Sequence, residues 1–176
     1  QLILQGVLPF VEVYNMKMPG IYAAYAVVLA LFGQTPFGIH IGLLVVNIVS
    51  TVLLFVTARR YMEPAPSLIA AISFLCFTLN SGVLGAFAHA THFVVLFGLA
   101  GFYVLLRPAK PLRWHDALAA GLLLGCAFMM KQHAAPFIAV AGVYLFWGRR
   151  SDTSVSAALK ALSLALFIVG VLAPFL

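Results

Sequence analysis

The feature that most constrains this chain is a succession of long apolar runs that end at basic residues. The clearest run covers residues 36–58, contains no Asp, Glu, Lys or Arg, and stops at Arg59 and Arg60. A helix needs about 20 mostly apolar residues to cross the ~30 Å hydrocarbon core of a bilayer. Hydrophobic residues make up 64% of the sequence and charged residues only 8%, which excludes a soluble globular domain. The sequence therefore predicts an integral membrane protein.

Further apolar runs follow the first one, and their continuous apolar character predicts helices. We therefore expect an all-α, polytopic transmembrane bundle with about six spans. A break is expected near Asn80, Ser81 and Gly82, towards the end of the second span, and Asp116 is a candidate N-cap for the fourth. The expected spans cover residues 36–58, 67–87, 93–106, 117–130, 134–147 and 160–176, and the start of the third is expected to reach back to His89.

The first 35 residues differ from the rest of the chain. Residues 1–15 are mixed in polarity, and residues 21–33 are apolar but too few to span a bilayer. Tyr22 and Tyr25 suit a membrane interface. The sequence predicts an outer loop with a juxtamembrane helix over residues 1–35, and a transmembrane helical domain over residues 36–176. The chain starts without a methionine and stops within an apolar run, so we expect it to be truncated at both ends.

Basic residues distinguish the two sides of the membrane. Lysine and arginine are enriched in cytoplasmic loops, and eight of the ten fall in turns that share one side, which we interpret as cytoplasmic. The other two, Lys17 and Lys131, fall on the outer side. The net charge of +6 is thus interpreted as a topology signal, and no nucleic-acid partner is expected. The eight are Arg59, Arg60, Arg107, Lys110, Arg113, Arg149, Arg150 and Lys160.

Polar residues from three separate segments are expected to join these two lysines on the outer side. A charge at the centre of a spanning helix costs roughly 2.5 to 3.5 kcal/mol, so Lys131, at the end of a short span, should have a partner. A phosphate group would suit two lysine ammonium groups. Both lysines could equally extend to lipid head groups, and the residues alone leave the two interpretations open. The other polar residues expected there are Glu12, Asn15, Asn80, His89, His92, Gln132 and His133.

Few residues on the outer side could act as a base or bind a metal ion. Glu12 is the one outer carboxylate in the sequence, and it could be a weak candidate for a general base, a solvated loop residue or an ion-pair partner of Lys17. His89 and His92 could share a metal ion, but no nearby cysteine or carboxylate completes a ligand set. We therefore assign no metal site and no certain cofactor, while a divalent metal stays open.

Two segments resemble a known family of enzymes. Residues 6–22, GVLPFVEVYNMKMPGIY, resemble the first outer loop of polyprenyl-phosphate-dependent GT-C glycosyltransferases, which reads approximately G-x-x-P-Y-x-D-x-x-D-x-K-P-P-G. Residues 125–132, GCAFMMKQ, are similar to the short family helix that ends in a lysine. The branch concerned contains the protein O-mannosyltransferases and the aminoarabinose transferase that modifies lipid A.

The resemblance implies a multi-pass enzyme of the bacterial inner membrane. It would move a sugar from a polyprenyl-phosphate donor to a lipid, glycan or protein acceptor at the outer face, among membrane lipids. Lys17 matches the family lysine near the carrier phosphate, and Lys131 matches a second one. Asn15, His89, His92, Gln132 and His133 are expected as neighbours.

The sequence departs from the family pattern at several positions of the first outer loop. Glu12 and Asn15 stand where the family has aspartates, so a carboxylate role at position 15 is in doubt. Phe10 replaces a tyrosine and Met18 replaces the first proline. The family's catalytic aspartate falls before residue 1, so the catalytic base is unknown and the chain alone is expected to be inactive.

Two other classes of function stay open from the sequence. A transporter or flippase for an anionic lipid or solute could use the same lysines for binding without chemistry, and broken spans would favour it. A noncatalytic assembly subunit would need neither lysine. An acidic residue in the upstream loop would favour the transferase, because transfer to a hydroxyl group needs a base.

Overall fold

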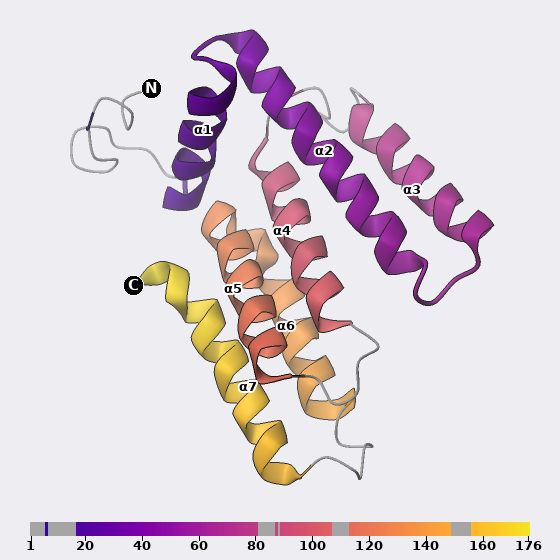
Figure 1. Ribbon diagram of the computed structural model, residues 1–176. Coiled ribbons are helices and arrows are strands. Elements are labelled where there is room, and N and C mark those ends of the chain that lie inside the picture. Colours follow the sequence, from indigo (N-terminus) through magenta and orange to yellow (C-terminus); the bar gives the residue numbers. More distant parts are fainter. Residues whose placement is uncertain (1–5, 7–16, 81–86, 88, 107–112, 149–155) are drawn as a thin grey trace.

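The computed structural model describes residues 6, 17–80, 87, 89–106, 113–148 and 156–176. Within these ranges, every regular element is helical, as the sequence predicts (Figure 1). A 3-10 turn (Gln132–Ala134) precedes the sixth helix, a π-helical turn (Tyr144–Gly148) follows it, and a 3-10 turn (Ala173–Phe175) follows the seventh. The helices are α1 (Pro19–Phe32), α2 (Pro36–Ala58), α3 (Pro64–Leu79), α4 (Ala90–Leu105), α5 (Trp114–Met130), α6 (Ala135–Val143) and α7 (Ala157–Leu172).

Two of the described helical segments are long and apolar enough to cross a membrane. One is α2, whose 23 residues coincide with the expected span, and the other is the 19-residue segment Ala157–Phe175. Pro36 occupies the first turn of α2, and the Thr35 hydroxyl accepts a hydrogen bond from the Gly38 N–H at 3.1 Å. Four further helices, α1, α3, α4 and α5, are apolar but shorter. The expectation of about six spans therefore stays a prediction.

Several helix ends agree with the sequence. α3 stops at Leu79, and Asn80 adopts an extended conformation (φ −74°, ψ 130°), so the expected break near Asn80 is confirmed. α4 has His89 as its N-cap, where the sequence places the start of that span. Residues 19–32 form a helix, as expected of the juxtamembrane segment.

Two helix starts differ from the prediction. α5 begins at Trp114, so Arg113 occupies the N-cap position and the prediction that Asp116 caps the helix is wrong. Asp116 lies instead in the first turn, where it is buried and its carboxylate is 3.8 Å from His115 Nε2. A negative charge in the first turn is favourable because the helix N-terminus carries a partial positive charge. α7 begins at Ala157, three residues before Lys160, because the Ser156 hydroxyl caps it.

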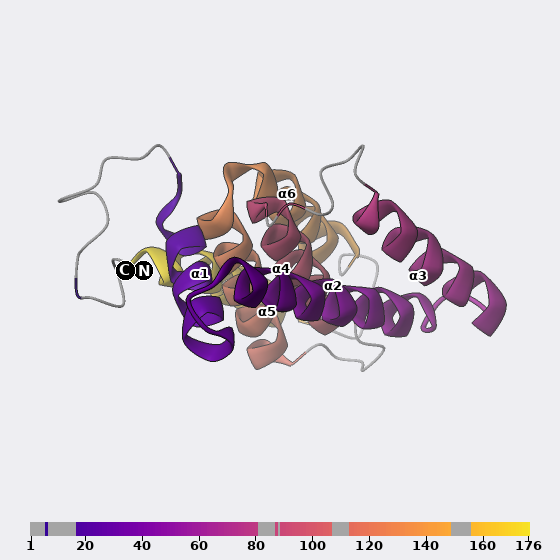
Figure 2. The ribbon, with the colours of Figure 1, turned by 90° about the horizontal axis from the view of Figure 1, so that it is seen from above.

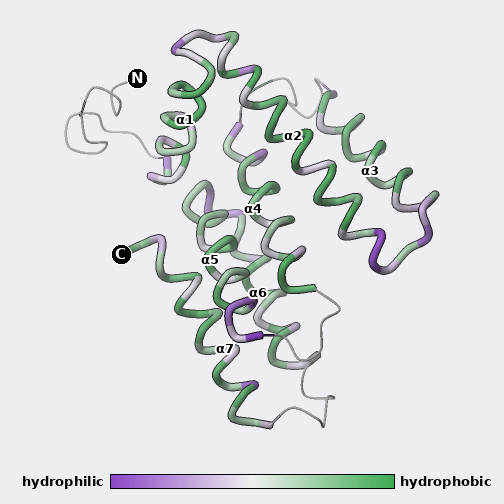
Figure 3. The backbone as a smooth tube through the Cα atoms, in the orientation of Figure 1, coloured by the Kyte–Doolittle hydropathy of each residue, from purple (hydrophilic) through white to green (hydrophobic). Residues whose placement is uncertain are grey.

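The helices α4 and α5 form the centre of the bundle. α5 packs against α4 and α7, while α2 contacts α1, α3 and α4. Figures 1 and 2 both show α3 beside α2, on the side away from α5. The helices α2 to α7 alternate in direction, and Figure 3 shows apolar residues along them and hydrophilic residues near their ends.

One end of the bundle gathers basic residues and is fixed by polar contacts. Arg60, just after α2, donates a hydrogen bond to the Tyr103 carbonyl at 2.6 Å, and its guanidinium lies 3.8 Å from the centre of the Tyr103 ring. The Tyr61 hydroxyl donates to the Leu106 carbonyl at 3.0 Å. These contacts join the end of α2 to the end of α4. The alternating helices place the starts of α5 and α7 at the same end.

Two apolar clusters hold the helices together. One joins α1, α2, α4 and α5 through buried residues that include Ile21, Val46 and Phe93. The other joins α4, α5, α6 and α7 around Leu124 and Phe167. The first cluster includes Met130, the last residue of α5, so it reaches the end of the bundle opposite to Arg60.

Glycines allow α5 and α7 to approach closely. A Cβ atom on Gly121 would overlap the Phe167 carbonyl, one on Gly125 would overlap the Val171 carbonyl, and one on Gly170 would overlap the Leu118 carbonyl. Small residues four positions apart favour such packing between membrane helices. The Gly121 and Gly125 pair in the sequence therefore has a structural role.

We predict that Gly121→Ala destabilises the protein, because the added methyl group meets backbone that cannot move without displacing α7. Overpacking of this kind typically costs about 1 to 3 kcal/mol. The matched control is Gly142→Ala in α6, because a Cβ there meets no atom within 4 Å. Thermal unfolding of the full-length protein in detergent should show a lower melting temperature for Gly121→Ala only. Equal melting temperatures for the two variants would contradict this account of the α5–α7 contact.

Candidate functional site

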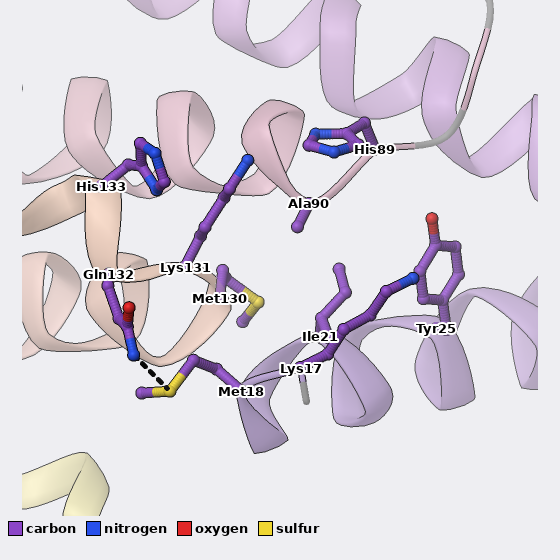
Figure 4. A pocket seen from close by; sticks show the side chains of 10 residues that line it. All are labelled: Lys17, Met18, Ile21, Tyr25, His89, Ala90, Met130, Lys131, Gln132 and His133. Carbon is purple, nitrogen blue, oxygen red and sulfur yellow. Dashed lines mark hydrogen bonds between the residues drawn. The ribbon is translucent and has the colours of Figure 1, made fainter. Parts of the chain in front are cut away.

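Polar residues near the starts of α1 and α4 and the end of α5 surround a pocket of about 240 Å³ (Figure 4). Pockets that enclose a drug-sized molecule typically measure roughly 300 to 1,000 Å³, so this one suits a compact polar group such as a phosphate. Its lining comes from segments that are far apart in the sequence. The lining residues are Lys17, Met18, Ile21, Tyr25, His89, Ala90, Met130, Lys131, Gln132 and His133.

Lys131 reaches the pocket because α5 ends immediately before it. Its backbone is extended (φ −163°, ψ 138°), although its N–H still bonds to the Ala127 carbonyl at 3.3 Å. The 3-10 turn over Gln132–Ala134 then leads into α6. The chain therefore reverses direction at Lys131, and this residue is only partly exposed.

Lys17 reaches the same pocket because α1 packs closely against the end of α5. Met18 is the extended N-cap of α1, and Pro19 supplies the first helical residue. A Cβ atom on Gly20 would lie 2.6 Å from the Met129 carbonyl oxygen, so any larger residue would push the helices apart. Gln132 Nε2 also lies 4.0 Å from Met18 Sδ, as a weak hydrogen bond between the two segments.

His89 completes the pocket from the start of α4. Its Nδ1 accepts a hydrogen bond from the Thr91 backbone N–H at 3.4 Å and lies 2.7 Å from Thr91 Oγ1. Desolvation by neighbouring protein atoms lowers the pKa of His89 below its ordinary value of 6.5, although the residue is exposed overall, and the positive charges of Lys131 and Lys17, together with His133, lower it further. Figure 4 shows the end of the Lys131 side chain directed towards the His89 ring.

The pocket favours a negatively charged ligand. It brings together two lysines and two histidines, and none of the ten lining residues carries a carboxylate. Within the part of the chain that the structure describes, Lys17 and Lys131 make no side-chain hydrogen bond or ion pair. An anion between them would relieve their mutual repulsion and gain charge-assisted hydrogen bonds.

A metal site is not evident in the described residues. Their histidine, cysteine, aspartate and glutamate side chains form no group of three that could hold an ion. His92, which the sequence places near His89, does not line the pocket. Its Nδ1 lies 2.9 Å from Oδ1 of the buried Asn47, so it joins α4 to α2.

Five of the residues expected at the site do meet there: Lys17, His89, Lys131, Gln132 and His133. His92 was expected as a neighbour but lies outside the lining, because its ring turns towards α2. Glu12 and Asn15 lie outside the residues that the structure describes.

Sequence reasoning missed Tyr25, which was assigned to the membrane interface. Tyr25 and Ile21 both line the pocket, and they follow Lys17 at intervals of four residues. Ile21 and Tyr25 are four residues apart and therefore lie on the same face of α1, while Lys17 precedes the helix. This spacing after Lys17 could have revealed the face of α1 that forms the pocket.

Comparison with known proteins identifies the family. Residues 17–176 match the model of the dolichyl-phosphate-mannose-protein mannosyltransferases. The chain is also similar to an undecaprenyl phosphate-alpha-4-amino-4-deoxy-L-arabinose arabinosyl transferase of Pseudomonas aeruginosa (strain UCBPP-PA14), with 31% identity over 127 residues. That match covers 69% of this chain and 23% of the relative, so the chain spans about a quarter of the relative's length. No solved structure matches.

The family match includes both lysines, the His89 segment and all seven helices among the described residues. The resemblance to the family is therefore confirmed, while residues 6–16 of the first motif lie outside the matched range. The chain belongs to the dolichyl-phosphate-mannose-protein mannosyltransferase family of membrane glycosyltransferases.

Proposed function

We propose that the full-length protein transfers a sugar from a polyprenyl-phosphate donor to a lipid, glycan or protein acceptor, and that the described pocket binds the carrier phosphate. The observation that carries this proposal is the convergence of Lys17 and Lys131, from separate segments, in one pocket whose described lining has no carboxylate. Membership of the family and the similarity to the undecaprenyl phosphate-dependent arabinosyl transferase support a polyprenyl-phosphate donor.

The two lysines would act on the leaving group. Negative charge builds up on the carrier phosphate as the bond between the sugar and the phosphate oxygen breaks. Ammonium groups that are already in place stabilise this charge more strongly in the transition state than in the bound donor, which raises the rate of transfer. The partial burial of Lys131 reduces screening by water and strengthens the interaction.

The acceptor hydroxyl must lose a proton during transfer, and this step needs a base. Glu12 is a weak candidate within the chain, and we propose instead an aspartate upstream of residue 1, as the family resemblance implies. The pocket residues are thus assigned to donor binding. The base is assigned to the part of the protein that forms the acceptor site.

We further propose that the protein is a multi-pass protein of the bacterial inner membrane, with α2 to α7 as its spans here. The end of the bundle that carries Arg60 and Arg113 would face the cytoplasm, in accordance with the excess of positive charge in cytoplasmic loops. The pocket would then open to the outer face, where Lys17 and Lys131 meet the donor.

The first prediction of this proposal concerns Lys17. In the full-length protein, Lys17→Ala should lower the release of sugar from a radiolabelled polyprenyl-phosphate donor by about 100-fold or more, the typical effect of losing one transition-state contact. Lys17 is exposed, so the melting temperature should not change. The control is Arg113→Ala, because Arg113 is exposed at the opposite end of the bundle. If folded Lys17→Ala protein releases sugar at the normal rate, the phosphate role is ruled out. If the wild type binds the donor in a Lys17-dependent way but releases no sugar, a transporter or flippase is favoured.

The second prediction concerns pH. A bound anion would oppose the effect of Lys131, Lys17 and His133 on His89 and raise its pKa, so the complex would hold more protons than the free protein. Donor affinity should therefore rise a few-fold from about pH 7.5 to about pH 5.5, a range that includes the ordinary pKa of 6.5. His89→Asn should reduce this rise in affinity. The same measurement on His133→Asn shows how much of the rise depends on the other histidine of the pocket. Affinity that falls with decreasing pH would contradict the prediction.

The third prediction concerns the orientation in the membrane. Single cysteines are introduced at Gln132, in the turn after α5, and at Glu63, in the turn before α3, after replacement of Cys76 and Cys126 by alanine. Both target positions are exposed. A membrane-impermeant maleimide added to intact spheroplasts should label position 132 and not position 63. Labelling of position 63 alone would reverse the assigned orientation.

A further inference from the structure

The cap of α4 favours one position for the proton of the neutral His89 ring. The Thr91 backbone N–H donates to Nδ1 at 3.4 Å, and the Thr91 hydroxyl lies 2.7 Å from the same nitrogen. A nitrogen that accepts a hydrogen bond keeps its lone pair, and the proton of a neutral imidazole must then lie on the other nitrogen. An Nδ1–H ring could donate to the Thr91 hydroxyl but would lose the backbone cap hydrogen bond, whereas an Nε2–H ring can accept from the Thr91 N–H at Nδ1. The cap therefore favours the Nε2–H tautomer of the neutral ring.

The remaining nitrogen belongs to the pocket. His89 is an exposed residue of the pocket lining, and Figure 4 shows its ring facing the end of Lys131. Desolvation and the neighbouring lysines lower the pKa of His89 and so disfavour a positive charge on its ring. His89 thus offers the pocket a fixed N–H donor without a charge of its own.

We propose that His89 donates a hydrogen bond from Nε2–H to a phosphate oxygen of the polyprenyl-phosphate donor, and thereby fixes the orientation of the phosphate between Lys17 and Lys131. This inference rests on the proposed function of the pocket. A lysine ammonium on a flexible stem attracts an anion without directing it, whereas an imidazole held by its helix cap supplies a donor in one direction. A fixed orientation favours transfer, because the sugar carbon must face the acceptor.

Two amide substitutions separate this role from helix capping. The Asn amide oxygen can replace Nδ1 as acceptor of the cap hydrogen bond, but its amide N–H groups lie nearer the backbone than Nε2. Gln is one methylene longer, so its amide N–H can approach the position of Nε2, while Gln is a poor N-cap. His89→Asn therefore keeps the cap and loses the donor to the ligand, and His89→Gln does the reverse.

The experiment measures binding of undecaprenyl phosphate to the full-length protein in lipid nanodiscs, together with melting temperatures. We expect His89→Asn to keep its melting temperature and bind about 10-fold more weakly or worse, because a hydrogen bond to a charged group is lost. His89→Gln should melt at a lower temperature and bind within about threefold of the wild type, because its N–H replaces the lost donor. Lys17→Ala is included to test the pocket itself.

Each other outcome has a definite meaning. Wild-type binding by His89→Asn, or equal weakening in both variants, overturns the role of the Nε2–H donor. If Lys17→Ala weakens binding while both His89 variants bind like the wild type, the phosphate pocket stands and the inference about His89 fails. If Lys17→Ala and both His89 variants all bind like the wild type, the proposed phosphate role of the pocket fails as well.

Discussion

The close approach of α1 to the end of α5 is the contact on which the candidate site depends. Gly20 lies against the Met129 carbonyl, where a Cβ atom would come within 2.6 Å of the oxygen. This contact brings Lys17, three residues before Gly20, into the same pocket as Lys131, two residues after Met129. If the helices stood further apart, the two lysines would belong to separate surfaces and could not bind one phosphate.

Apolar packing below the pocket keeps this arrangement in place. Ile21 and Met130 belong both to the pocket lining and to the apolar cluster that joins α1, α2, α4 and α5. Tyr25 and Phe93 extend this packing through an edge-to-face contact with ring centres 5.9 Å apart. Burial of apolar groups thus supplies the rigidity that holds two like charges near each other, and a bound anion would remove the repulsion between them.

The sequence predicts the helices more reliably than the site, and the reason is physical. Apolar runs, prolines and basic turns are local signals, so the range of α2 and the break at Asn80 follow directly from them. The role of Gly20 depends on a neighbour more than 100 positions away, as does the participation of Tyr25. Asp116 shows that local signals can also mislead. Aspartate is a common N-cap residue, but α5 begins before it, at Trp114. His92 was placed correctly along the chain, yet the buried Asn47 on α2 determines where its ring points.

Basic residues have different surroundings at the two ends of the bundle. This difference helps to decide whether Lys131 binds a phosphate in the pocket or extends to lipid head groups. At one end Arg60 is bound by the Tyr103 carbonyl and ring, so the protein itself satisfies this charge. At the other end Lys131 is partly buried and directed towards His89, across the pocket. A lysine that served only the lipid surface would gain most by pointing away from other basic groups. The inward direction of Lys131, towards a ring whose pKa it lowers, is better explained by an anion that enters the pocket and interacts with both lysines.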